Sequence, residues 1–121
     1  YHTLGTKALV NPPLRSQSDV DALWEGIQDG TIDTIGTDHA PHTLGEKMQP
    51  YGKAPSGFAS IEIYFSLLLN AYHQHKLSLE QIVSLTHTRP QEIFRLPPND
   101  DVVLVDLEEI RTVSDAKLHT K

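Results

Sequence analysis

Two short apolar runs, separated by one amphipathic segment, most constrain how this chain folds. Residues 7–10 are mostly apolar and run into Asn-Pro-Pro at 11–13, which predicts a strand ending in a rigid loop because proline cannot donate to a sheet ladder. Residues 20–27 place apolar side chains at helical spacing, with serine caps before them and Gly30 after them. Residues 31–37 are rich in β-branched side chains and predict a second strand. This order predicts a β-α-β unit with parallel strands.

Asn11 and Asp38 each directly follow one of these predicted strands. In parallel sheets covered by helices, reactive groups collect at the carboxyl ends of the strands. Since one helix and one strand separate the two residues, we expect them at neighbouring strand ends.

The rest of the chain continues the alternation of elements. Residues 43–57 hold several prolines and glycines without periodicity, which predicts a long loop, and loops of this length are usually functional or disordered. The expected fold class is therefore α/β. The further elements predicted are helices over 61–72, 78–85 and 88–96, followed by a strand over 102–105.

Composition excludes several classes of protein. The chain has 121 residues, a net charge of −6 and no cysteine. Nucleic-acid and anionic-membrane surfaces select for clustered Lys and Arg, so neither partner is expected. Without thiolates, a transition metal would be held by His, Asp or Glu. The longest apolar run, around residues 65–69, is too short to span a membrane, and we expect a soluble, cytoplasmic protein.

The sequence after the second predicted strand carries the strongest chemical signal. Asp38, His39 and His42 put a carboxylate and two imidazoles within five residues, a set suited to metal binding or to general acid–base chemistry. An Asx turn with two solvent-exposed histidines explains the same residues equally well.

Two other motifs favour a structural role. The segment 11–15 reads more readily as a stiff connector than as a ligand site, because paired prolines leave few conformers. His73 and His75 lie at the end of a predicted helix, where positions i and i+2 point in opposite directions and cannot share one ion.

Several motifs together resemble one family. They are Asn11-Pro12-Pro13-Leu14-Arg15, Leu23-Trp24-Glu25-Gly26, Asp29-Gly30-Thr31-Ile32-Asp33, Thr37-Asp38-His39-Ala40-Pro41-His42, Glu46-Lys47, Ala54-Pro55-Ser56-Gly57 and Thr88-x-Pro90 before Phe94. From about residue 7 to residue 107, this pattern resembles the closing section of the dihydroorotase family. These enzymes are cyclic amidohydrolases of the binuclear-metal (β/α)8-barrel superfamily.

The resemblance implies a role for each matching residue. Asp38 matches an aspartate that touches the metal centre, takes a proton from the attacking hydroxide and delivers it to the leaving amide nitrogen. Asn11 and His42 match residues that hold dihydroorotate, with His42 on its carboxylate. The backbone of Ser56 and Gly57 matches a loop that closes over the pyrimidine ring.

The resemblance also implies an activity and a cofactor. The activity is the reversible closure of N-carbamoyl-L-aspartate to (S)-dihydroorotate in pyrimidine biosynthesis, and the cofactor is a pair of zinc ions. Of the family's metal ligands, Asp38 alone has a match here, so we expect the 121 residues by themselves to be inactive. The expected partners are the substrate and either the remainder of a barrel or a second copy of the chain.

The expected architecture is the carboxyl-terminal part of such a barrel. About strands seven and eight with their helices would occupy residues 1–98, and residues 99–121 would begin a small accessory β-domain. A full barrel needs roughly 250 residues. Two alternatives stay open: another cyclic amidohydrolase, such as a hydantoinase (dihydropyrimidinase) or an allantoinase, and a non-catalytic dihydroorotase-like domain with a structural role.

Overall fold

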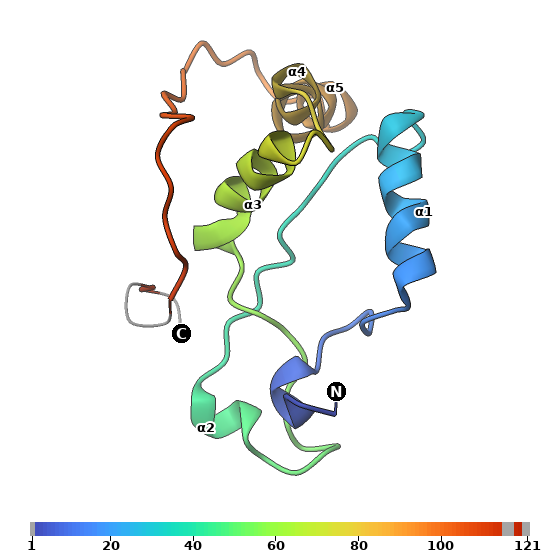
Figure 1. Cartoon of the computed structure of the whole chain (residues 1–121), viewed down its shortest axis with the longest axis vertical. Coiled ribbons are helices and arrows are strands. Elements are labelled where there is room, and N and C mark those ends of the chain that lie inside the picture. Colours follow the sequence, from blue (N-terminus) through green and yellow to red (C-terminus); the bar gives the residue numbers. More distant parts are fainter. Residues whose placement is uncertain (1, 115–117, 120–121) are drawn as a thin grey trace.

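The computed structural model describes residues 2–114 and 118–119, and the regular elements in these ranges are all helical. The longest helix, α3, lies between the pair formed by α4 and α5 at one end and α2 with η1 at the other (Figure 1). In chain order the elements are η1 (Gly5–Ala8), α1 (Gln17–Gln28), α2 (Leu44–Lys47), α3 (Ile61–His73), α4 (Leu79–Val83), η2 (Ser84–Thr88) and α5 (Arg89–Phe94).

The three predicted strands are wrong for the described residues. Residues 7–10 lie partly in the 3₁₀ turn η1, while 31–37 and 102–105 run extended without a ladder. The pairing observed is one parallel bridge between His39 and Phe58. A strand forms only where a neighbouring strand accepts and donates its backbone hydrogen bonds.

Within residues 31–37, backbone groups bond to a helix carbonyl and to a side chain instead of to another strand. The N–H of Ile35 donates to the carbonyl of Leu85 at 3.2 Å, and the carbonyl of Ile35 accepts from the Tyr64 hydroxyl at 2.7 Å. Burial raises the pKa of Tyr64, so this hydroxyl keeps the proton that it donates. The backbone hydrogen bonds of Ile35 are therefore made with η2 and α3, and not with a neighbouring strand.

The predicted helices are confirmed where local capping signals mark them. Ser16 begins α1, and its N–H donates to the Asp19 carboxylate. Ser78 begins α4 and exchanges reciprocal hydrogen bonds with Gln81, three positions later. Gly30 follows α1 with φ +80°, a left-handed conformation that favours glycine at a helix end. The helix predicted over 61–72 is α3.

The predicted loop 43–57 contains the short helix α2, so that prediction is wrong for 44–47. Thr43 and Glu46 form a capping box: the Thr43 N–H donates to Glu46 Oε2 at 2.8 Å, and the Glu46 N–H donates to Thr43 Oγ1 at 3.3 Å. The hydroxyl and the N–H of Thr43 both donate to Glu46 Oε2, and these two bonds lower the pKa of the Glu46 carboxyl. The prolines and glycines around this short helix are typical of a loop, which is why the sequence predicted no helix here.

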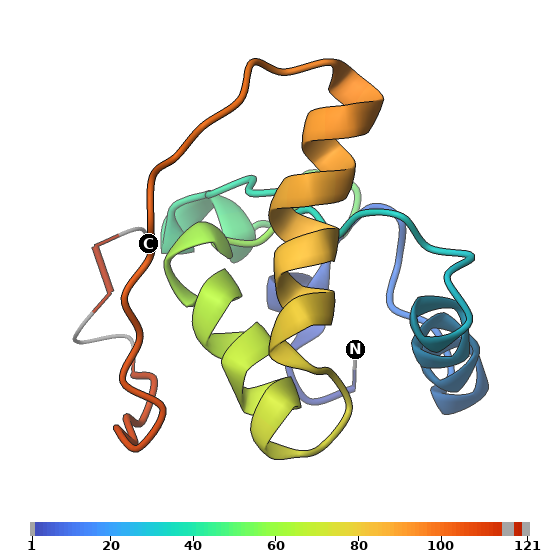
Figure 2. The same cartoon turned by 90° about the horizontal axis from the view of Figure 1, so that it is seen from above.

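The last two predicted helices form one continuous rod beside α3, joined by the π turn η2 (Figure 2). Pro90 has no N–H, and its ring would clash with a carbonyl four residues earlier in a regular α-helix. A wider π turn just before this proline avoids that clash. The rod ends at Phe94, where Arg95 adopts a left-handed conformation (φ 53°), slightly earlier than predicted.

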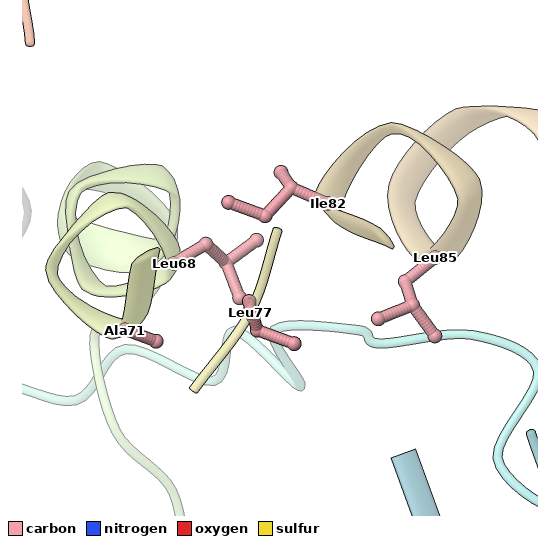
Figure 3. Packing of buried hydrophobic residues seen from close by; sticks show 5 residues of the cluster. All are labelled: Leu68, Ala71, Leu77, Ile82 and Leu85. Carbon is pink, nitrogen blue, oxygen red and sulfur yellow. The ribbon is translucent and has the colours of Figure 1, made fainter. Parts of the chain in front are cut away.

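A small apolar core lies between α3 and the rod. Figure 3 shows the side chains that make it: Leu68, Ala71, Leu77, Ile82 and Leu85. Trp24 and Ile27 of α1 pack against this cluster, and Gln28 hydrogen-bonds the carbonyl of Lys76. The core therefore joins α1, α3, α4 and η2. None of the helices in the described ranges has the length and apolar composition needed to cross a membrane.

Residues 99–114 leave this core as an extended segment (Figure 1). Most of its apolar side chains face solvent, with Leu104 93% exposed and Ile110 96% exposed. A domain boundary at 98/99 stays a prediction, and residues 115–117 and 120–121 of the predicted accessory domain lie outside the described residues.

His39 caps the amino end of α3. Its Nδ1 accepts from the backbone N–H of Ser60 at 3.0 Å and from that of Ile61 at 3.2 Å. Nδ1 therefore carries no proton in this arrangement, and the cap satisfies two N–H groups that an α-helix leaves without an internal partner.

We predict that His39→Leu lowers the free energy of unfolding by about 0.5–2 kcal/mol, the usual cost of losing a helix cap. His39→Asn is the matched variant, because its Oδ1 lies close to the position of Nδ1 and keeps an acceptor there. Urea titration followed by circular dichroism measures both. An Asn variant as unstable as the Leu variant would contradict the capping role.

Candidate functional site

The predicted site residues come from three segments that meet at residues 56–58. The Gly57 N–H donates to the carbonyl of Leu9 at 3.0 Å, and the Ala40 N–H donates to the carbonyl of Phe58 at 3.0 Å. The sequence predicted that Asn11 and Asp38 lie at neighbouring strand ends. In the structure the segments that carry them are not direct neighbours, because residues 56–58 lie between them. All five predicted residues are nevertheless within two positions of a residue that makes one of these contacts.

Asp38 is exposed, and its backbone is held on both sides. The carbonyl of Thr37 accepts from the Ser60 hydroxyl at 2.8 Å, while His39 caps α3 as described above. Asp38 itself adopts φ +44°, a conformation that aspartate tolerates better than most residues. No described group hydrogen-bonds its carboxylate, so both oxygens are available to a proton or a ligand.

His42 and Ser56 are in direct contact. Nε2 of His42 lies 3.2 Å from the carbonyl oxygen of Ser56, and since a carbonyl only accepts, Nε2 is the donor. The other ring nitrogen, Nδ1, has no hydrogen-bond partner among the described residues. It can donate to an anionic ligand when the ring is doubly protonated.

Gly57 is buried where a side chain would not fit. A Cβ built on its backbone would lie 2.6 Å from the carbonyl oxygen of Ala40 and 3.3 Å from Nε2 of His42. Its φ of +141° also disfavours other residues. The close approach of this peptide to residues 40–42 therefore requires glycine.

Asn11 lies on the other side of the same loop. Together with Ser56, Tyr51 and residues of η1, it lines an open pocket of about 550 Å³. The pocket brings Asn11 close to the Ser56 segment, which the sequence had linked only through the resemblance.

The described residues do not make a complete zinc site. No group of three or more His, Asp or Glu side chains gathers within the described ranges. His39 uses Nδ1 to cap α3, and Nε2 of His42 donates to Ser56. His73 and His75 are exposed at the end of α3, as predicted. The Asp38 carboxylate and Nδ1 of His42 are thus unused donors among the described residues, and a zinc site would need further donors from elsewhere.

Sequence reasoning gave no role to Lys47, although this residue lies at the centre of the region. Its Nζ donates to backbone carbonyls of two segments around the pocket, and the residue is only 8% exposed. Lysine side chains are almost never this buried, so the residue type by itself predicts an exposed position for Lys47. The capping box that begins at Thr43 was the one available signal, because it places Lys47 on a short helix instead of in a free loop.

No protein-family model matches the chain, but individual proteins do. It is 40% identical to the dihydroorotases of Anaplasma phagocytophilum, Halobacterium salinarum and Brevibacillus brevis. These matches cover 97%, 97% and 98% of this chain, and 28%, 30% and 30% of the relatives. The chain therefore spans less than a third of the length of these relatives.

Solved structures give a consistent picture. A D-hydantoinase matches with a TM-score of 0.67 at 25% identity, over 73% of this chain and 20% of that one. A D-hydantoinase (dihydropyrimidinase) from Thermus sp. matches with a TM-score of 0.69 at 29% identity, over 77% of this chain and 21% of that one. The fold thus matches part of a barrel amidohydrolase, although the described residues contain no strand. Over nearly its whole length, this chain is dihydroorotase-like.

Proposed function

We propose that this chain forms the carboxyl-terminal part of a dihydroorotase, which reversibly closes N-carbamoyl-L-aspartate to (S)-dihydroorotate in pyrimidine biosynthesis in the cytoplasm. Residues 1–98 would contribute about strands seven and eight of the barrel, and residues 99–121 the start of an accessory β-domain. The observation that carries the proposal is Asp38, an exposed and unpartnered carboxylate fixed beside the His42–Ser56–Gly57 contact. The 40% identity to dihydroorotases supports the choice of substrate.

Asp38 would act as the proton carrier. One of its oxygens takes a proton as an oxygen nucleophile attacks the ring amide carbonyl, and then gives it to the departing amide nitrogen. In the direction of ring closure the same carboxyl group works in reverse. An exposed carboxylate without a protein hydrogen bond suits this exchange, because no partner has to be displaced when the proton arrives.

Substrate binding would fall to the loops around Asp38. With Nε2 on the carbonyl of Ser56, His42 would use Nδ1–H to bind the carboxylate of dihydroorotate. Asn11 would supply an amide to the ring edge, and the Ser56–Gly57 backbone would lie against its face. Gly57 supports this role because a side chain there would block the approach of the two loops.

Zinc enters this proposal only as a cofactor of the complete enzyme. The pair of zinc ions that the family resemblance implies would supply a Lewis acid and a source of hydroxide. Asp38 is the ligand that the resemblance implies, and no group of three or more His, Asp or Glu side chains gathers among the described residues, so the remaining ligands would come from other barrel strands. The 121 residues alone are accordingly expected to be inactive.

A hydantoinase is the second candidate, because both structural matches above are D-hydantoinases. Turnover of dihydroorotate, hydantoin, dihydrouracil and allantoin by the full-length protein separates the candidates. Preference for dihydroorotate supports our proposal, preference for another ring supports a different cyclic amidohydrolase, and turnover of none supports a non-catalytic structural domain.

We predict that Asp38→Asn in the full-length enzyme lowers kcat by about 10²–10⁴-fold, the usual contribution of a general acid–base residue. Asparagine keeps the shape of the side chain but cannot carry the proton. Steady-state turnover of dihydroorotate measures the loss. The control is Asp21→Asn on the exposed face of α1, which should retain wild-type activity. More than about a tenth of wild-type turnover in Asp38→Asn would contradict the role.

We predict that His42→Ala raises KM for dihydroorotate about 10–100-fold, the loss expected for one hydrogen bond to a charged group. Because the carboxylate is bound equally in the ground and transition states, kcat should change little. His73→Ala, at the exposed end of α3, is the control. An unchanged KM together with a collapsed kcat would place His42 in the chemical step instead.

A further inference from the structure

The ammonium group of Lys47 is buried and bonded only to backbone carbonyls. Its Nζ donates to the carbonyl of Leu9 at 2.7 Å, to that of Pro55 at 3.0 Å and to that of Gly57 at 3.1 Å. An ammonium group has three N–H donors, so all of them are used. No carboxylate among the described residues forms an ion pair with it.

The three carbonyls belong to the two segments that carry the predicted substrate contacts. Leu9 lies two residues before Asn11, while Pro55 and Gly57 flank Ser56 on both sides. The Gly57 N–H adds a direct bond to the same carbonyl of Leu9. Removing the ammonium group would therefore leave one bond between the segments where there are now several.

Burial of a charge without a counter-ion is costly, so a lysine persists there only where its charge is well satisfied. The capping box at Thr43 and Glu46 fixes the short helix that ends at Lys47. The Phe58 ring lies 5.6 Å from Nζ and shields it on a further side. Helix, ring and carbonyls together hold the ammonium group in one place.

We propose that Lys47 is a positioning residue that clamps the Asn11 segment to the Pro55–Gly57 loop and so preforms the substrate cradle. Lys47 does not touch the substrate: its donors are all taken by carbonyls. It holds the Ser56 peptide, and through it His42, at the place where the pyrimidine ring would bind. The proposed link to substrate affinity rests on the proposed function, whereas the clamp itself does not.

The test compares Lys47→Met with Lys53→Met in the full-length protein. Methionine keeps the linear side chain but has no donor, and Lys53 is an exposed lysine of the same loop. Hydrogen–deuterium exchange over residues 55–58 reports the Gly57 N–H, which donates to the carbonyl of Leu9. This exchange should become at least about tenfold faster in Lys47→Met, because the two segments that the bond joins lose the charged donor that holds them together. Exchange within α3 should stay unchanged, and Lys53→Met should match the wild type throughout.

The kinetic readout separates positioning from general stability. In Lys47→Met, KM for dihydroorotate should rise about tenfold or more while kcat changes less, because the cradle forms only on binding. Wild-type exchange over 55–58, or a lowered kcat with unchanged KM, would overturn the inference. If the protein does not act on dihydroorotate, the proposed function fails, while the exchange result still decides the clamp.

A third variant decides the case in which Lys47→Met also loosens α3. Lys47→Arg keeps the charge and several donors on a bulkier group. Exchange over 55–58 between that of the wild type and Lys47→Met, with α3 intact, supports the clamp. If exchange over 55–58 in Lys47→Arg is as fast as in Lys47→Met while KM equals that of the wild type, the clamp is overturned.

Discussion

The junction between residues 37–39 and the amino end of α3 is the contact on which the candidate site depends. The Ser60 hydroxyl bonds the carbonyl of Thr37, and the backbone of Ser60 bonds the ring of His39. Asp38 lies between these two bonds, so its main chain cannot move without breaking a helix cap. The Asp38 carboxylate is thereby tied to the start of a helix, although the segment around it has no regular secondary structure.

The side chains of Asp38 and Lys47 have opposite environments. Asp38 is exposed and has no described hydrogen-bond partner, which suits a group that must gain and lose a proton. Lys47 is buried and fully bonded, which suits a group that must stay in place. The difference follows from desolvation: a buried charge persists only with its donors satisfied, while an exposed one remains free to react.

Absence of strands in the described residues follows from the shortage of neighbours. Residues 31–37 bond to α3 and to the rod, and residues 102–105 stay exposed. Apolar side chains such as Leu104 are the kind that a sheet would bury. The match to part of a hydantoinase is consistent with segments whose sheet partners belong to other strands. The barrel is therefore proposed for a longer protein that would supply these strands.

By itself the sequence determined the longer helices and the family likeness, while the short helix α2 was missed. Ser16, Ser78 and Gly30 act through bonds within a few residues, so their patterns predicted α1 and α4 correctly. The predicted strands failed because a strand needs partners that local sequence does not specify. Only the tertiary structure decided the site's framework: His39 meets a helix 21 residues away, and Lys47 bonds a carbonyl 38 residues away. Contacts at such separations depend on how the whole chain packs, which no local pattern encodes.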